Sequence, residues 1–204
     1  MKKLTALIMA LAVFTCALFA QESDSVSSTN EWYDHVRVET DFRLGLVTSS
    51  VDMRGAYMFP LNSVIAFDAG LDLLFNDSSL LTGFVSAVSE SYGGSSVSYK
   101  STNINPFASV WFWNLYVSYG FGLAIADGGI GFNIYDIRLG WQPKFNKKDR
   151  GLCFKMELGF ASAVCTVKEP DTNAKKDADG NYPVITSLQN GGDFFLTLGA
   201  SYKF

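Results

Sequence analysis

The chain has 204 residues, of which 48% are hydrophobic, 15% aromatic and only 18% charged, against roughly 25% charged residues in an average soluble domain. Intrinsic disorder is excluded, because so much apolar surface can build a core. The net charge of −4 argues against a nucleic-acid partner, and the single histidine argues against a histidine-built metal site. We therefore expect no metal and no cofactor.

The first twenty residues have the parts of a secretory signal peptide. Two lysines directly after Met1 precede an uncharged, mostly apolar stretch that is followed by polar residues. We expect residues 1–20 to be removed, with cleavage after Ala20 or Ala17. Two alternatives stay open: an N-terminal membrane anchor, for which the stretch is short, and lipid attachment at Cys16, whose preceding residues match a lipobox poorly.

A short linker is expected over residues 21–31, followed by one domain over residues 32–204. The hydrophobic period in this domain is two rather than 3.6, which is typical of β-strands with two different faces. Residues 104–113 are expected to be a strand whose phase the pattern does not fix. Seven further strands are predicted at 36–46, 52–59, 65–75, 115–125, 135–142, 152–160 and 193–204.

The connections between the predicted strands differ in length at the two ends of the sheet. Short turns near Pro60, Asn114 and Phe145 share one end, and the long segments 76–103 and 166–192 lie at the other. Short periplasmic turns and longer external loops are typical of outer-membrane barrels. We therefore predict an all-β fold, an eight-stranded antiparallel up-and-down transmembrane β-barrel with both termini in the periplasm.

Alternation alone does not separate a membrane barrel from a soluble one, whose apolar face points inward. The polar row of the strand at 115–125 carries no charge and has mostly small residues, including Gly120 and Gly122, which suits a narrow lumen. A basic residue facing the bilayer midplane would cost about 2–4 kcal/mol. The charged residues that share the phase opposite to the apolar rows are Arg37, Glu39, Asp41, Arg43, Asp52, Arg54, Asp68, Asp72, Asp136, Arg138, Lys155, Glu157, Asp193 and Lys203.

These inward charges predict an ion-pair network that plugs the lumen, because buried charges are tolerated only when they are paired. Across neighbouring strands we expect Arg54 near Asp68 or Asp72, and Arg138 near Glu157. Such a barrel would have no wide aqueous channel.

A helical membrane span is a rival interpretation for residues 101–126, which carry no charge. The turn residue Asn114 and the many β-branched and aromatic residues favour two strands instead. The two cysteines Cys153 and Cys165 lie too far apart along one strand for a disulfide, so we expect free thiols. An aromatic girdle is predicted at the periplasmic end from Trp32, Tyr33, Tyr57, Phe59, Trp113, Trp141, Tyr202 and Phe204.

The last eight residues match the terminal signal of bacterial outer-membrane barrels at Thr197, Gly199, Tyr202 and Phe204. With the signal peptide and the eight strands, residues 32–204 resemble the small outer-membrane barrels of the OmpX, OmpA-barrel and OmpW types. The resemblance implies location in the outer membrane of a diderm bacterium, contact with its lipid, and insertion by the barrel-assembly machinery.

Four functions are weighed for such a barrel. An enzyme is not expected, because the only histidine, His35, has no serine motif beside it. The match of residues 177–181 to a calcium-binding loop is weak, since the distal glutamate of such loops is missing. We expect the loops 76–103 and 166–192 to present a surface to an extracellular ligand. The alternative is an OmpW-like narrow channel for small hydrophobic solutes, with an apolar gate of Leu80, Leu81, Phe84 and Val85.

Overall fold

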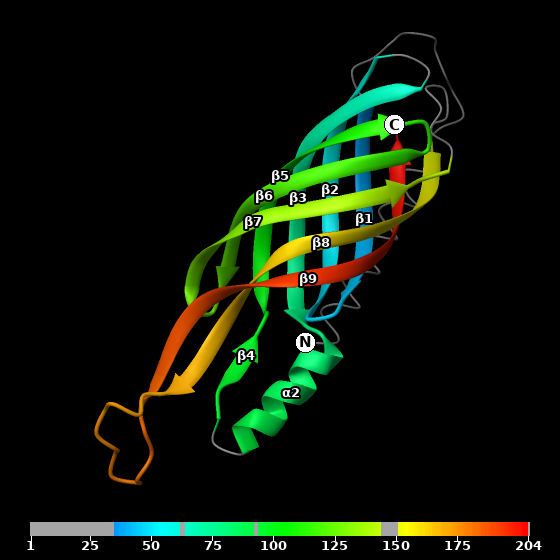
Figure 1. Ribbon diagram of the computed structural model, residues 1–204. Helices are drawn as coiled ribbons and strands as arrows, with labels where there is room; N and C mark the ends of the chain where they lie inside the picture. Colours follow the sequence, from blue (N-terminus) through cyan, green and yellow to red (C-terminus); the bar gives the residue numbers. More distant parts are fainter. Residues whose placement is uncertain (1–34, 62–63, 92–93, 144–150, 204) are drawn as a thin grey trace.

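The computed structural model describes residues 35–61, 64–91, 94–143 and 151–203. These residues form a closed antiparallel β-barrel of eight strands with one short additional strand and one helix (Figure 1). The all-β barrel predicted from the alternation is therefore confirmed. The predicted signal peptide and linker lie outside the described residues.

The strands follow one another around the barrel in chain order. The barrel closes because β1 pairs with β2 on one side and with β9 on the other, while β8 also pairs with β9. The short strand β4 adds to the free side of β8. The elements are β1 Val36–Gly45, β2 Thr48–Pro60, β3 Ile65–Ser78, α2 Leu80–Ser91, β4 Ser96–Ser98, β5 Ser101–Phe112, β6 Leu115–Ala126, β7 Gly129–Trp141, β8 Gly151–Pro170 and β9 Val184–Lys203.

The two ends of the barrel differ. The register Arg37↔Lys203 places the start of β1 and the end of β9 at one end, which we call the terminus end. The opposite end, called the hairpin end, holds α2, β4 and the part of the β8–β9 hairpin that projects beyond the other strands (Figure 1). At the terminus end β5 and β6 are joined through Trp113 and Asn114, and Trp113 has a φ of 60°, a left-handed conformation that bulky residues seldom adopt.

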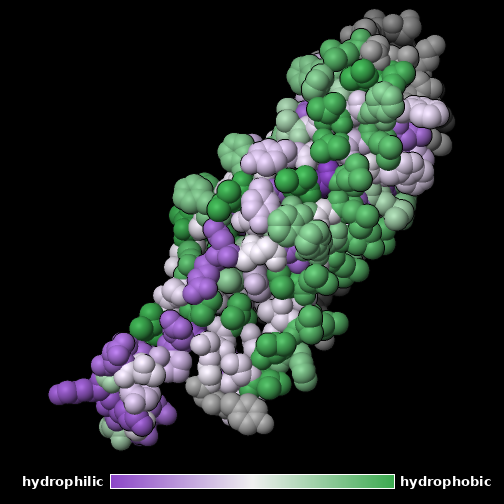
Figure 2. All heavy atoms as spheres, viewed as in Figure 1, coloured by the Kyte–Doolittle hydropathy of each residue, from purple (hydrophilic) through white to green (hydrophobic). Residues whose placement is uncertain are grey.

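Alternation controls which side chains face the lumen. On β5, whose phase the sequence left open, Phe107 and Trp111 point inward and are buried, while Val110 and Phe112 are exposed on the outer wall. The visible face of the wall is accordingly dominated by hydrophobic residues (Figure 2). The barrel thus has an apolar exterior and a polar interior.

Both segments expected to be long loops contain regular structure, which corrects the predicted boundaries. The segment 76–103 holds α2 and β4, and the segment 166–192 is mostly a continuation of β8 and β9, so that their connection spans only 171–183. Beyond the barrel the strands have no apolar wall to maintain. Their sequence therefore lacks the apolar–polar alternation that identified the other strands, while backbone pairing continues.

Candidate functional site: the charged lumen

Charged side chains from six of the barrel strands meet inside the barrel, and none is more than 3% exposed. Strands β5 and β6 contribute uncharged residues instead, among them Asn105 and Ser118. Five basic groups thus face eight acidic groups. The buried charged residues are Arg37, Glu39, Asp41, Arg43, Asp52, Arg54, Asp68, Asp72, Asp136, Arg138, Lys155, Glu157 and Asp193.

Arg138 on β7 is the centre of the network. Its Nε lies 2.8 Å from Asp136 Oδ1 and its Nη2 lies 2.5 Å from Asp72 Oδ2. Its Nη1 contacts Asp52 Oδ2 at 3.1 Å and Glu157 Oε2 at 3.3 Å. One guanidinium group therefore joins carboxylates from β2, β3, β7 and β8, and the predicted contact between Arg138 and Glu157 is present.

Lys155 and Arg54 extend the network towards the terminus end. Lys155 Nζ lies 2.5 Å from Glu39 Oε2, 2.6 Å from Asp41 Oδ2 and 3.2 Å from Glu157 Oε1. Arg54 contacts Glu157 Oε1 at 3.4 Å. Glu157 is therefore shared between Lys155, Arg54 and the central arginine, which links the two groups of ion pairs.

Of the two partners predicted for Arg54, the structure brings Asp72 within 3.3 Å. Asp68 accepts from Arg37 instead, and Arg37 Nε also lies 2.8 Å from Glu39 Oε1. The sequence pattern assigned these residues to one face, but it held no information on which carboxylate each arginine would reach.

Two aromatic residues close the lumen at the terminus end, and the sequence did not identify them as part of the site. Trp111 stacks on Tyr116 with ring centroids 4.2 Å apart. The Arg37 guanidinium lies 4.5 Å from the Trp111 ring centre, and Trp111 Nε1 donates to Asp68 Oδ2 at 2.7 Å. Tyr116 donates its hydroxyl to Glu157. Rings and charges are therefore packed together rather than separated into layers.

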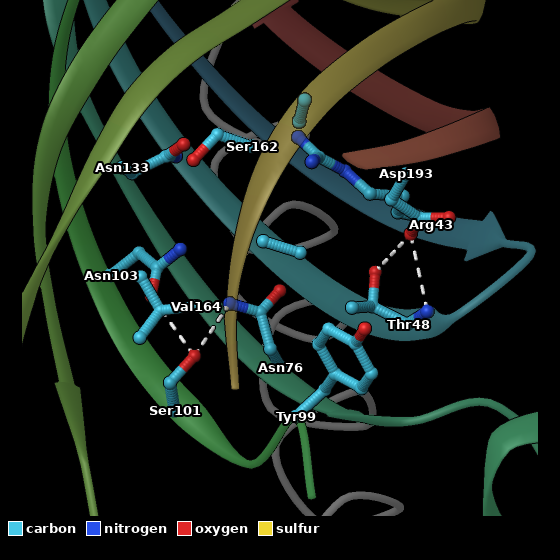
Figure 3. A pocket seen from close by; sticks show the side chains of 12 residues that line it. Arg43, Thr48, Asn76, Tyr99, Ser101, Asn103, Asn133, Ser162, Val164 and Asp193 are labelled. Carbon is cyan, nitrogen blue, oxygen red and sulfur yellow. Dashed lines mark hydrogen bonds between the residues drawn. The ribbon is translucent and has the colours of Figure 1, made fainter. Parts of the chain in front are cut away.

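At the hairpin end the network leaves a small polar cavity (Figure 3). Arg43 contacts Asp136 at 2.8 Å and its guanidinium lies 3.8 Å from the Phe195 ring centre. Asp193 accepts from the backbone N–H of Thr48 at 3.1 Å and from the Thr48 hydroxyl at 2.5 Å. The cavity volume of about 10 Å³ is enough for about one water molecule.

Closer to the centre, the space between Arg54, Asp72, Phe107 and Arg138 has no volume that could hold a water molecule. Side chains therefore fill this section of the lumen. Chemically, the arrangement joins the strands through shared ion pairs and leaves no room for water at this level.

The four residues predicted as an apolar gate, Leu80, Leu81, Phe84 and Val85, all lie on α2. Their side chains are exposed, between 58% for Val85 and 96% for Leu80. In this structure they face outward from the helix and line no constriction of the lumen.

The other residues singled out from the sequence lie at several places. Gly199 lies against Asp41 so closely that a Cβ atom on residue 199 would meet the Asp41 carboxylate, and Thr197 is fully buried in the lumen.

His35 packs against Tyr57 with ring centroids 5.5 Å apart. Asp177 accepts from two backbone N–H groups of its own turn, at Asp179 and Asn181. Cys153 and Cys165 are free thiols, as expected.

The aromatic residues at the terminus end differ in how far their side chains are exposed. Phe59, Trp113 and Trp141 are exposed on the outer wall, in agreement with the predicted girdle, but Tyr202 is buried. Trp32, Tyr33 and the terminal Phe204 lie outside the described residues.

No family model, curated protein or solved structure matches this chain. Within the described residues, no helix combines the length and hydropathy needed to cross a membrane.

Proposed function

We propose that the chain is an integral outer-membrane β-barrel protein, with a plugged, ion-paired lumen, whose hairpin end lies outside the cell and presents a surface for interaction. The observation that carries this proposal is the orientation of the side chains. Thirteen charged residues are buried inside the barrel, and large apolar residues are exposed around it. A barrel stable in water has the opposite arrangement.

The outer wall supports contact with lipid. Val117, Phe121, Leu139 and Leu158, which lie on three consecutive strands, are each exposed by more than half. Contiguous apolar surface on this scale is rare on soluble monomers. A bilayer removes the cost of this exposure, while the backbone polar groups of a closed barrel are already paired between strands.

The projecting end supports a role in surface interaction. The connection 171–183 carries Lys175, Lys176, Asp177 and Asp179, all of them exposed, on a rigid two-stranded support. Loops positioned by a rigid scaffold commonly carry recognition. The partner that we expect is an extracellular ligand, and insertion by the barrel-assembly machinery is part of the same proposal.

Accessibility on intact cells tests the proposed location and orientation. An epitope inserted into 171–183 should be labelled by antibody and removed by protease on intact cells. The matched control is the same epitope inserted between Trp141, where β7 ends, and Gly151, where β8 begins and pairs with Lys203 at the terminus end. It should react only after the outer membrane is disrupted. Equal reactivity of both positions on intact cells would contradict the proposed orientation.

Conductance tests the plug separately. The purified protein in planar bilayers should show no large, stable conductance, because side chains fill the middle of the lumen. Large, stable openings would overturn the plugged barrel, and uptake of small apolar solutes by liposomes would favour the OmpW-like channel.

A further inference from the structure

The helix α2 is attached to the rest of the protein through its polar side. Ser79 begins the helix by accepting from the Thr82 N–H at 3.2 Å, and its hydroxyl donates to Leu46 O at 2.8 Å. One turn later, the Thr82 hydroxyl donates to Val47 O at 3.1 Å. These bonds hold the start of α2 against the turn between β1 and β2.

The next turn of the helix repeats this attachment. Ser86 donates its hydroxyl to Val97 O at 2.8 Å and accepts from Val97 N–H at 3.0 Å. Because Thr82 and Ser86 are four residues apart, they lie on the same side of the helix. The side of α2 that faces the protein is therefore made of serine and threonine.

The opposite side of α2 is apolar and exposed. Leu80, Phe84 and Val88 follow one another at intervals of four residues, and Leu81 and Val85 extend the same stripe. All five side chains are exposed, Phe84 by 70%, and no residue of the helix is buried. A helix on a soluble protein normally buries its apolar stripe against the core, so α2 has the reverse orientation.

We propose that α2 is an interfacial anchor whose apolar stripe, Leu80, Leu81, Phe84, Val85 and Val88, inserts among the lipids of the membrane that surrounds the barrel. The inference rests on the proposed membrane location. It goes further by assigning a lipid-binding role to a segment between two strands that is itself too short to span a bilayer.

Continuity with the outer wall selects lipid as the occupant. The turn that holds the start of α2 includes Leu46, which is exposed, as are Leu44 on β1 and Phe75 on β3. The helix α2 follows directly after β3 at the hairpin end (Figure 1), so its apolar stripe begins next to these exposed residues. The helix also follows the same rule as the wall, with hydrogen-bonding groups inward and hydrocarbon outward.

The charge of α2 specifies the kind of attachment. The helix has no basic residue, and Glu90 is its only charged residue. Attraction to anionic headgroups therefore contributes nothing, and insertion depends on buried apolar area alone. The interaction should not weaken when salt is added, in contrast to anchors rich in lysine and arginine.

The test places one fluorophore at a time on the full chain, in a background whose native cysteines are replaced by serine. NBD is attached to Phe84→Cys on the stripe, to Glu90→Cys on the same helix but turned away from the stripe, or to Phe121→Cys on the barrel wall. Each protein is reconstituted into phosphatidylcholine vesicles. Quenching by nitroxide-labelled phospholipid is compared with quenching by iodide in the buffer.

The expected result is that labels at positions 84 and 121 lose most of their emission to the lipid quencher and little to iodide, at low and high salt alike. The label at position 90 should show the reverse. A label at 84 that iodide quenches, while the label at 121 reports lipid, would overturn the anchor and leave the membrane barrel standing.

Two further outcomes would also overturn the anchor. A label at 84 that neither quencher reaches would show that protein, a second copy or another partner, covers the stripe. A label at position 121 that the lipid quencher does not quench would contradict both the proposed membrane barrel and the anchor.

Discussion

The barrel and the part of the β8–β9 hairpin that projects from it have opposite polarity. Within the barrel, charged residues such as Arg138 are buried and apolar residues such as Leu139 are exposed. In the projecting part, Ala163, Cys165 and Val167 of β8 form a buried apolar cluster with Tyr99, which lies between β4 and β5. Lys168 and Glu169 are exposed. The same two strands, β8 and β9, run through both regions.

This reversal teaches that one strand can change the polarity of its two faces along its length. Near Ala161 on β8 the pairing with β7 ends, and beyond it apolar residues of β8 such as Val164 are buried, although Val184 and Ile185 on β9 are exposed. A further exception at the hairpin end is α2, whose outward apolar stripe follows the rule of the barrel. On the proposed membrane location, the boundary between lipid and water lies close to this level.

The largest effect is expected from breaking the charge network of the barrel. Arg138→Ala leaves Asp52, Asp72, Asp136 and Glu157 without their shared cation, and removing one partner of a buried ion pair costs about 3–5 kcal/mol. Urea unfolding of the protein in lipid vesicles measures the loss. Lys176→Ala, an exposed residue of the projecting end, is the control and should change stability by less than about 0.5 kcal/mol.

A stability loss for Arg138→Ala no larger than that of the control would show that the ion pairs do not hold the barrel together. Arg138→Lys separates charge from geometry, because lysine keeps the charge but cannot reach several carboxylates with a planar fork. Its stability should lie between those of the wild type and the alanine variant.

The second-largest effect on stability is expected at the outer surface, where replacing an exposed apolar residue by arginine should have different consequences in the two regions. Leu139→Arg places a charge on the apolar wall and should cost about 2–4 kcal/mol in a bilayer. Ile185→Arg, at a similarly exposed residue of the projecting part, should cost less than about 0.5 kcal/mol. Equal costs in vesicle-based urea titrations would contradict a lipid boundary between these two positions.

The sequence predicted the barrel well because an apolar outer wall and a charged lumen impose alternation. On β1, Arg37 and Asp41 could be assigned to one face from the sequence alone, because they alternate with apolar residues such as Val38 and Phe42. The same logic failed on β5, where Trp111 and its neighbours are aromatic or apolar in both phases. A lumen-facing tryptophan that donates to Asp68 has no signature in a period-two pattern.

The hairpin end was harder to predict for a different reason. Residues such as Cys165 and Thr166 are paired with β9 outside the barrel, where no apolar wall requires alternation, and the segment therefore resembled a loop. For α2, the apolar residues were noted in the sequence, but as a gate within a loop and not as a stripe on a helix. The direction of the stripe could not be predicted, because it depends on which carbonyl groups Thr82 and Ser86 reach.

A smaller effect is expected at high pH in the apolar cluster of the projecting end. Burial raises the pKa of Tyr99 to about 12, and the neighbouring Cys165 contributes in the same direction. A tyrosine whose pKa is raised on folding stabilises the fold below its ordinary pKa of about 10, and this contribution is lost as the pH rises towards 12. NMR of ring-labelled tyrosine should show a signal, absent in Tyr99→Phe, that titrates well above the ordinary tyrosine pKa of about 10. Titration of this signal near its ordinary pKa of about 10 would contradict a tightly packed cluster.

The smallest effect is expected from shortening the tip of the hairpin. Asp171 N–H donates to Pro183 O at 2.8 Å, so the strands already meet where the connection begins. Replacing residues 171–183 with Asn-Gly, a pair suited to a two-residue turn, should change the urea midpoint of the barrel by an amount that corresponds to less than about 0.5 kcal/mol.

A deeper cut tests whether the two regions are independent. Removing 166–188 takes away Val167 from the apolar cluster and the partners of β4, so it should expose the remaining cluster residues to solvent and to protease. The ion pairs around Arg138 lie inside the barrel, and the deletion removes none of the residues that form them. The barrel should therefore still fold, as judged by resistance of its strands to protease in vesicles. Loss of that resistance would show that the two regions fold as one cooperative unit.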